Sequence, residues 1–368
     1  MLFKKIIVPG GNCRALLAFL FLAGAVLVLA TSPALAAGQP KTVAEIALYQ
    51  GPDREKLLIE GAKREGNFTL YISNSWIARE VSKEFEKKYP FIKVVAWHGQ
   101  SDKLVPRVLE EFAAGQLKAD AIESSHDTVL MLNRRGVFQE YYTPEAAYYP
   151  EAVKEKGKNG IYCLGNREIY NSLGFNTKLI SPAEAPKTYH DLLDPKWKGK
   201  MSITGVSTGV RWIGSILEAM GLEYLEKLSR QNIKVHKVGP VGLITLVIAG
   251  EVPLSPTITS FNVFDAKRKG APVEWRPLEP VLTSLGLSGI TATAPHPHAA
   301  MLFLDYLFST EGQRAAMQGG LSSPRKDIGG LETKFKKSYV GAGYSIEEFE
   351  KKYAEWETLL KRLFIQKR

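Results

Sequence analysis

Hydroxyl and amide side chains cluster at the ends of three short β-rich runs in the N-terminal half of the chain. The three polar segments are Ser73-Asn74-Ser75-Trp76, His98-Gly99-Gln100-Ser101 and Glu123-Ser124-Ser125-His126. Hydroxyls and amides bind polar solutes by hydrogen bonding, and the free N–H groups at the start of a helix attract anions. The same serines could act only as helix N-caps, because serine is favoured there. One such segment would say little, but three together favour a binding surface.

A fourth polar segment and two arginines could recognise a negatively charged group. Ser207-Thr208-Gly209 opens a predicted helix, whose backbone N–H groups could hold a carboxylate, phosphonate or phosphate oxygen. Arg211 lies just inside that helix, and a guanidinium such as that of Arg211 or Arg167 can bind an anion through two parallel hydrogen bonds. Two alternatives stay open. Arg211 could lie on a solvated helix face, and Arg167 could form a salt bridge between two lobes.

Helices and strands alternate in the segment that carries the first three polar segments. Apolar periodicity and stop residues predict helices over 52–65, 77–89 and 102–115, and strands over 67–72, 93–97 and 119–122. Strands joined by helices through short connections form a parallel sheet flanked by helices. The carboxyl ends of parallel strands meet at one edge of the sheet, which is where ligands bind in such folds.

A second unit of alternating elements begins near residue 169. We expect strands ending at 177 and over 201–203 and 252–258, and helices over 205–220, 242–249 and 260–269. An apolar run over 281–290 is followed by a further helix after residue 293. The tail over 345–368 has the spacing of an amphipathic helix, which is more typical of core packing than of a partner groove.

Length and composition indicate a folded protein with two lobes. A chain of 368 residues exceeds the size of one hydrophobic core, and 45% hydrophobic and 23% charged residues are ordinary for a globular protein. Two cysteines exclude a disulfide scaffold and a cysteine-based zinc cluster. The net charge of +10 is spread along helices beside acidic residues, so we expect no nucleic-acid partner.

The first 36 residues have the pattern of a cleavable secretory signal peptide. Lys4, Lys5 and Arg14 precede an apolar run over 15–30, and small residues up to Ala36 match a cleavage site. A membrane anchor is the alternative, although the run is shorter than the roughly 20 residues of a spanning helix. We therefore expect export to the periplasm.

Several sequence blocks occur in the order found in one family of exported proteins. The blocks are Ala62-Lys63-Arg64-Glu65-Gly66, Ala119-Asp120-Ala121-Ile122, Phe175-Asn176-Thr177, Tyr189-His190-Asp191-Leu192-Leu193-Asp194-Pro195-Lys196-Trp197-Lys198-Gly199-Lys200, Ala294-Pro295-His296-Pro297-His298 and Ser309-Thr310-Glu311-Gly312-Gln313. With these blocks the chain resembles the periplasmic solute-binding proteins of ABC importers, of the type II class and its ferric-binding-protein-like branch, also described as extracellular solute-binding protein family 1. The resemblance extends over nearly the whole chain after the signal peptide.

The resemblance implies a two-lobed type II periplasmic-binding-protein fold of the α/β class. Each lobe would be a mixed or mostly parallel sheet flanked by helices, with two hinge crossings near 165–170 and 285–290. It implies lobe 1 over 37–168 and 291–330, lobe 2 over 169–290 and a helical tail over 331–368. The lobes of such proteins close around a small solute, and the closed form is delivered to an ABC permease in the inner membrane. We expect a monomer with no cofactor.

Iron is the solute of many proteins in that branch, but this chain has other residues at the positions that bind iron there. The two adjacent tyrosines of ferric-binding members would fall at Ser260 and Phe261, and the ligands of the first lobe near Ser75 and Ser125. Phenylalanine has no donor atom and a neutral serine is a poor substitute for a phenolate, so we expect no metal site of the usual kind. Iron or an iron chelate stays open as an alternative.

The remaining polar and aromatic residues favour a small organic anion, such as a carboxylate or phosphonate. Trp76 and Phe261 could stack on an organic part of it, or could be core residues. A ligand sensor that docks on a membrane receptor would have the same fold. An exported enzyme is not supported, because the chain has no nucleophile elbow, zinc-protease motif or phosphate-binding loop. The predicted ligand-binding residues are Ser73, Asn74, Ser75, Trp76, Ser124, Ser125, Arg167, Ser207, Thr208, Gly209, Arg211, Ser260 and Phe261.

Overall fold

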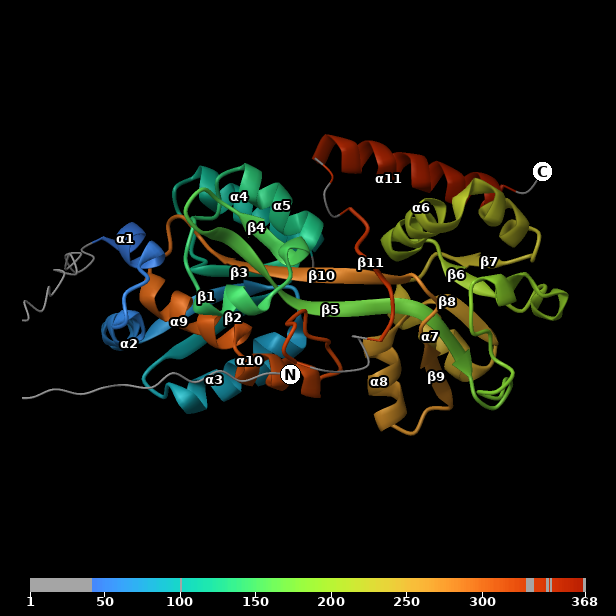
Figure 1. Ribbon diagram of the computed structural model, residues 1–368, viewed down its shortest axis with the longest axis horizontal. Helices are drawn as coiled ribbons and strands as arrows, with labels where there is room; N and C mark the ends of the chain where they lie inside the picture. The colour runs from blue at the N-terminus through green and yellow to red at the C-terminus, as the bar shows by residue number, and fades with distance from the viewer. Residues whose placement is uncertain (1–41, 100, 329–333, 342–343, 345, 367–368) are drawn as a thin grey trace, which may run out of the picture. The chain divides into compact units, whose positions relative to one another are not determined.

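A computed structural model describes residues 42–99, 101–328, 334–341, 344 and 346–366 (Figure 1). The expected signal peptide lies outside the described residues, so its cleavage stays a prediction. Within the described ranges, no helix has both the length and the apolar character needed to cross a membrane.

The predicted parallel sheet of the N-terminal half is confirmed. Strands β1 (Asn67–Ile72), β2 (Lys93–His98) and β3 (Ala121–Ser125) are hydrogen-bonded in the order β2-β1-β3, and both pairings are parallel. The helices that connect them are α3 (Ser82–Lys88), which continues a π-helical turn η1 (Ile77–Val81), and α4 (Ser101–Ala113). Helix α2 (Arg54–Glu65) precedes β1, and α5 (His126–Arg134) follows β3 directly.

Two long strands, which we call the crossing strands, connect the two halves of the fold. They are β5 (Ile161–Asn176) and β10 (Val281–Ile290), which pair antiparallel from Leu282↔Asn171 to Ser288↔Leu164. At one end β10 pairs with β3 and β5 with β4 (Lys154–Lys156). At the other end β5 pairs with β8 (Leu254–Thr259) and β9 (Val273–Arg276). Figure 1 shows β5 and β10 side by side along their length.

The buried hydrophobic residues form separate groups on either side of this crossing. The first core takes residues from 47 to 164 and from 285 to 321, whereas the second takes residues from 173 to 282 and from 356 to 364. A smaller third group lies around α7 and β8. The two-lobed α/β fold with two crossing segments is therefore confirmed, while the exact residue boundaries of the lobes stay a prediction.

The remaining elements cover the sheets of the two halves. Around the first core these are α1 (Val43–Leu48), α9 (Pro297–Phe308) and α10 (Thr310–Gln318). In the second half, β6 (Ser202–Thr204) pairs in parallel with β7 (Lys234–His236), and the helices are α6 (Ser207–Ser229), α7 (Pro240–Ala249) and α8 (Ser260–Arg268). Helices α6 and α8 each begin within three residues of the end of a strand.

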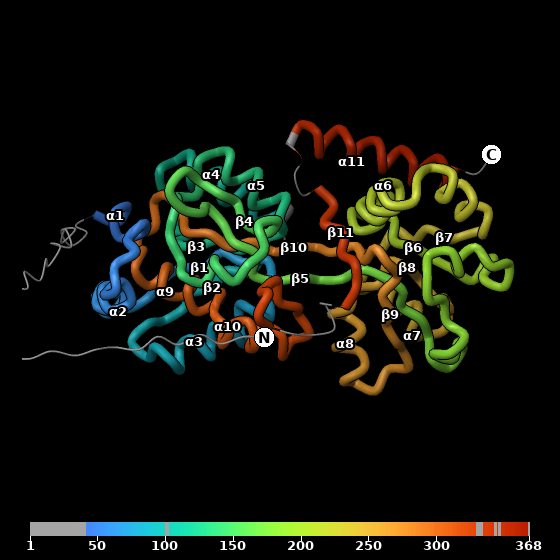
Figure 2. Tube along the Cα trace, viewed as in Figure 1, coloured from blue at the N-terminus to red at the C-terminus, as the bar shows by residue number. Residues whose placement is uncertain are grey.

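The C-terminal segment returns to the crossing strands and then packs on the second half. Strand β11 (Lys337–Ser338) pairs in parallel with β10, and α11 (Ile346–Leu360) with its last turn η7 (Lys361–Ile365) lies along α6. The traces in Figures 1 and 2 both place α11 beside α6. Trp356 is 1% exposed and contacts Gly214, so the tail helix contributes to the second core, as its spacing predicted.

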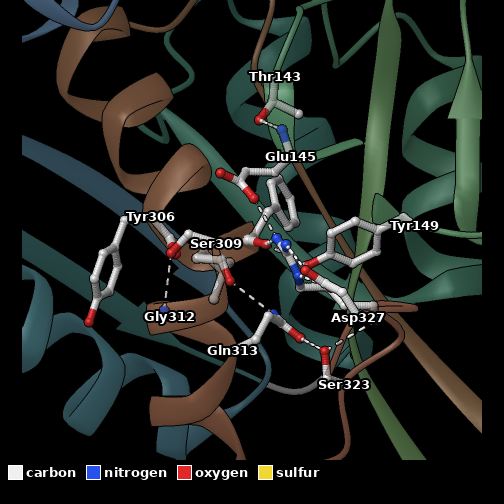
Figure 3. A network of polar contacts seen from close by, with 12 residues as sticks. Thr143, Glu145, Tyr149, Tyr306, Ser309, Gly312, Gln313, Ser323 and Asp327 are labelled. Carbon is white, nitrogen blue, oxygen red and sulfur yellow. Dashed lines mark hydrogen bonds and ion pairs between the residues drawn. The ribbon is translucent and has the colours of Figure 1, made fainter. Parts of the chain in front are cut away.

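A polar network holds the segment that leaves α10 against the first core. The side chain of Arg325 is 2% exposed and donates to Asp327 at 2.8 and 2.7 Å and to the carbonyl oxygen of Phe308 at 2.7 Å. Gln313 donates to the carbonyl oxygen of Asn166 in β5 at 2.9 Å. Figure 3 shows Gln313 and Asp327 within this network. The chain is thereby fixed to β5 before it reaches β11.

We predict that Trp356→Ala lowers the free energy of unfolding by about 3–5 kcal/mol, because it removes a fully buried indole from a packed contact with α6. Glu355→Ala on the exposed face of the same helix should change it by less than about 0.5 kcal/mol. Urea denaturation of the two variants checks this. Equal losses in both would show that α11 is not packed as described.

Candidate functional site

A buried ion pair lies where β3 ends beside the crossing strands. The Nε–H of Arg167 in β5 donates to Oε1 of Glu123 in β3 at 2.8 Å, and the two side chains are 8% and 0% exposed. The Arg167 side chain crosses directly over Gly286 of β10. A Cβ at Gly286 would lie 2.7 Å from it, so glycine is needed for the close approach.

The second oxygen of Glu123 accepts hydrogen bonds from the polar segment after β1. The backbone N–H groups of Ser73 and Asn74 each donate to Oε2 at 3.0 Å, and the Ser73 hydroxyl donates at 3.1 Å. The side chain of Asn74 accepts from the N–H groups of Trp76 and Ile77 at 3.1 and 3.0 Å, which is helix capping. Ser73, Asn74 and Arg167 therefore belong to one structural network around a buried carboxylate.

A second ion pair joins the first turn of α5 to the N-terminal part of α6. The guanidinium of Arg211 donates to Oδ2 of Asp127 at 2.7 Å, with the two side chains 21% and 37% exposed. Ser125 at the start of α5 shares a hydrogen bond of 3.0 Å with Thr128. The Nε–H of Arg211 is buried, and the part of the chain that the structure describes offers it no acceptor.

Two adjacent pockets open beside this ion pair. The outer pocket has a volume of about 550 Å³ and is lined by Ser125, Ser207 and Arg211 together with residues of α11. The inner pocket, of about 180 Å³, lies between α5, β10 and the C-terminal residues Tyr339, Val340, Gly341, Tyr344, Phe349 and Glu350. The two pockets share four lining residues, Asp127, Arg211, Phe349 and Glu350. We call them together the α5–α6 site.

The start of α6 depends on a glycine. A Cβ at Gly209 would lie 1.8 Å from the carbonyl oxygen of Thr204, and the Gly209 N–H already donates to Val206 at 2.8 Å. Ser207 is exposed and Thr208 is half-buried beside it. Gly209 thus shapes the helix start, while Ser207 lines the outer pocket.

The other predicted residues are not among those that line the two pockets. Ser260 accepts from the N–H of Tyr170 in β5 at 3.4 Å, and Phe261 packs against the first core. Trp76 donates from its Nε1–H to the carbonyl oxygen of Ala315 at 3.2 Å and is half-buried. Ser124 is fully buried in β3, and Ser75 is half-buried. Of the thirteen residues, the structure brings Ser125, Ser207 and Arg211 to one pocket.

The described residues hold no group of three or more histidine, cysteine or acidic side chains that could bind a metal ion. The two histidines of the Pro295-His296-Pro297-His298 block make structural contacts instead. His296 lies 3.1 Å from Asp120, and His298 lies 2.5 Å from Glu65, whose carboxylate also accepts from the first N–H groups of α9.

Comparisons with known proteins agree with this architecture. The family model of the bacterial extracellular solute-binding proteins matches residues 80–338. The chain belongs to this family. Its members bind solutes and are not enzymes, and this solute-binding protein is the substrate-binding component of an ABC importer that acts outside the cytoplasmic membrane, in the periplasm of bacteria that have one.

Solved structures show the same fold. Iron-bound HitA from Pseudomonas aeruginosa is 20% identical with a TM-score of 0.65, over 79% of this chain and 99% of that one. AfuA from Actinobacillus pleuropneumoniae, with fructose-6-phosphate bound, is 20% identical with a TM-score of 0.62, over 82% and 100%. An ABC transporter substrate-binding protein from Agrobacterium tumefaciens is 16% identical with a TM-score of 0.65, over 80% and 94%. The solute-binding protein therefore has the type II periplasmic-binding-protein fold.

Sequence reasoning missed three contributors to these networks. Glu123 and Asp127 flank Ser124 and Ser125 at the end of β3. An acidic side chain at such a strand end needs a positively charged partner, and this need could have identified both residues from the sequence. The C-terminal residues of the inner pocket gave no such signal, since only the tertiary fold brings Tyr339, Phe349 and Glu350 to α5.

We predict that Glu123→Ala or Arg167→Ala lowers the free energy of unfolding of the solute-binding protein by about 3–5 kcal/mol, because each leaves a buried charge without its counterion. The double variant Glu123→Ala/Arg167→Ala should lose less than the two single variants added together. Chemical denaturation of all four proteins measures this coupling. Strict additivity would contradict the buried pair.

Proposed function

We propose that this substrate-binding component captures a small organic anion, a carboxylate or a phosphonate, at the α5–α6 site and delivers it to its permease. The observation that carries the proposal is Arg211, whose guanidinium lines both pockets and whose buried Nε–H lacks an acceptor among the described residues. A guanidinium has five N–H donors, so Arg211 can bind an oxyanion beyond its bond to Asp127.

The partial exposure of the Arg211–Asp127 pair supports this role. An ion pair that water reaches contributes about 0–1 kcal/mol to stability, so a solute can compete with Asp127 at little cost. Arg167 is different, because Glu123 holds it in a buried pair whose loss is costly. We therefore assign the solute's acid group to Arg211 and a structural role to Arg167, with Ser125 and Ser207 as polar neighbours of the solute.

Ferric iron or an iron chelate is the second candidate, because HitA is an iron-bound protein of the same fold. At the two positions where such proteins place tyrosines, this chain has Ser260 and Phe261. Carboxylates of Asp127 and Glu350 do line the outer pocket, and they could meet a cation. The charge of Asp127 therefore separates the two candidates.

A thermal-shift panel tests the function directly. The mature chain would be heated with carboxylates, with phosphonates and with ferric citrate, since a solute that binds only the folded state raises the Tm. We expect organic acids to raise the Tm without iron. A rise with ferric citrate that citrate alone does not reproduce, and with no other acid, would overturn the proposal.

We predict opposite effects of the two partners in the α5–α6 ion pair. Arg211→Ala should weaken binding of the organic acid at least about tenfold, while Arg211→Lys keeps the charge and loses less. Asp127→Asn should strengthen binding of an anion severalfold, because it removes a competing carboxylate and a like charge. For a cation the effect of Asp127→Asn has the opposite sign. Isothermal titration measures both, with Glu355→Gln on the exposed face of α11 as the charge-matched control.

A further inference from the structure

We propose that six C-terminal residues form a wall of the solute site, and that the inner pocket takes an apolar, ring-sized part of the bound acid. The wall consists of Tyr339, Val340, Gly341, Tyr344, Phe349 and Glu350. This inference rests on the proposed function, and it adds that the solute is an amphiphilic acid.

The inner pocket has the size and lining for a hydrocarbon ring. Its volume is about 180 Å³, and an apolar protein cavity of about 150 Å³ is enough to bind benzene. Apolar side chains come from α5 (Leu130 and Met131), from β10 (Leu282 and Leu285) and from the C-terminal segment (Val340 and Phe349). The lining also has polar and charged members, so a solute there can be oriented by hydrogen bonds. These are His126, Thr128, Thr283, Ser284, Tyr339 and Tyr344, together with Asp127, Arg211 and Glu350.

The inner pocket adjoins the outer pocket at Arg211, the residue to which we assign the acid group of the solute. Arg211 and Phe349 line both pockets, and the guanidinium carbon of Arg211 lies 5.9 Å from the centroid of the Phe349 ring. A solute whose acid group meets Arg211 therefore has its neighbouring atoms against Phe349. Close packing of that ring requires Gly341, where φ is +92° and a Cβ would lie 2.8 Å from Phe349.

The wall is attached to the crossing strands. Strand β11 is hydrogen-bonded to β10 with Val281↔Lys337 and Leu282↔Ser338 in register. Lys337 lies 2.5 Å from the buried carboxylate of Glu168 in β5.

Tyr339, the first residue of the wall, is fixed at the same carboxylate. Its phenol donates a hydrogen bond to Glu168. Burial and the charge of Glu168 raise the pKa of Tyr339 well above its usual value, so the phenol keeps the proton that it donates.

The wall is also attached to α6. The hydroxyl of Ser215 donates to Ser338 at 3.0 Å, and Tyr344 donates to Glu218 at 2.5 Å. On the opposite side, Leu130 and Met131 belong to α5 of the first half. The apolar part of a solute would thus bridge the two halves of the protein, which is how a solute can favour one arrangement of them.

Matched pairs of acids test the wall. Isothermal titration would compare phenylphosphonate with methylphosphonate, and phenylacetate with acetate, on the mature protein. Burial of a phenyl group is worth a factor of about ten or more, so the wild type should bind each aromatic acid at least about tenfold more tightly than its small partner. Phe349→Ala should reduce this ratio to below about threefold, and Phe349→Leu should keep a larger part of it.

The affinity ratio within each variant separates a binding role from loss of fold, because both acids are measured on the same protein. Lys351→Ala on the exposed side of α11 is the control and should leave the ratio unchanged. Equal affinities for aromatic and small acids in the wild type would overturn the apolar wall and leave the proposed function standing. A loss in Phe349→Ala that is equal for both acids would also overturn it. If no acid binds the wild type, the proposed function fails and this inference fails with it.

Discussion

The architecture around the crossing depends on the need to neutralise one buried carboxylate. Glu123 has no exposure to water, and desolvation of an unpaired carboxylate would cost several kcal/mol. Arg167 supplies the positive charge, and two backbone N–H groups with a serine hydroxyl supply the remaining donors. Those partners come from β5 and from the turn after β1, so the requirement of a single carboxyl group fixes the ends of two parallel strands against a crossing strand.

The cost of burying a charge also distinguishes Arg167 from Arg211, which look equivalent in the sequence. Both were candidates for an anion, and both have an acidic partner in the structure. Their exposure to water decides their roles. Water screens the Arg211–Asp127 pair, so a solute can replace Asp127, whereas the Arg167–Glu123 pair is buried and costly to break. A solute anion at Arg211 would compete with Asp127 for the guanidinium, whereas the buried guanidinium of Arg167 is already held by Glu123.

Local sequence patterns predicted the elements well and the site in part. Strand β1 was expected over 67–72 and is found over Asn67–Ile72, because alternating apolar residues and a glycine stop define it. The short strands β4 and β9 have too few residues for any period to appear.

Serine and asparagine at strand ends are ambiguous for a physical reason. Capping a helix and binding a solute use the same oxygen atoms, and Asn74 caps whereas Ser207 lines a pocket. The place of Tyr339, Val340 and Phe349 in the inner pocket could not be predicted, since it arises from pairing between β11 and β10.

The pairing of β11 with β10 also couples the wall to movements of the crossing strands. The wall is hydrogen-bonded to a crossing strand and to α6, while the opposite side of the inner pocket is α5 of the first half. Bending of β5 and β10 would move Phe349 relative to Leu130 and so change the volume of the inner pocket. The pocket and the angle between the halves are then coupled, and a solute that fills the pocket favours the arrangement whose volume it matches. Selectivity for the solute's apolar part and closure of the protein would in that case have a common structural origin, the attachment of β11 to β10.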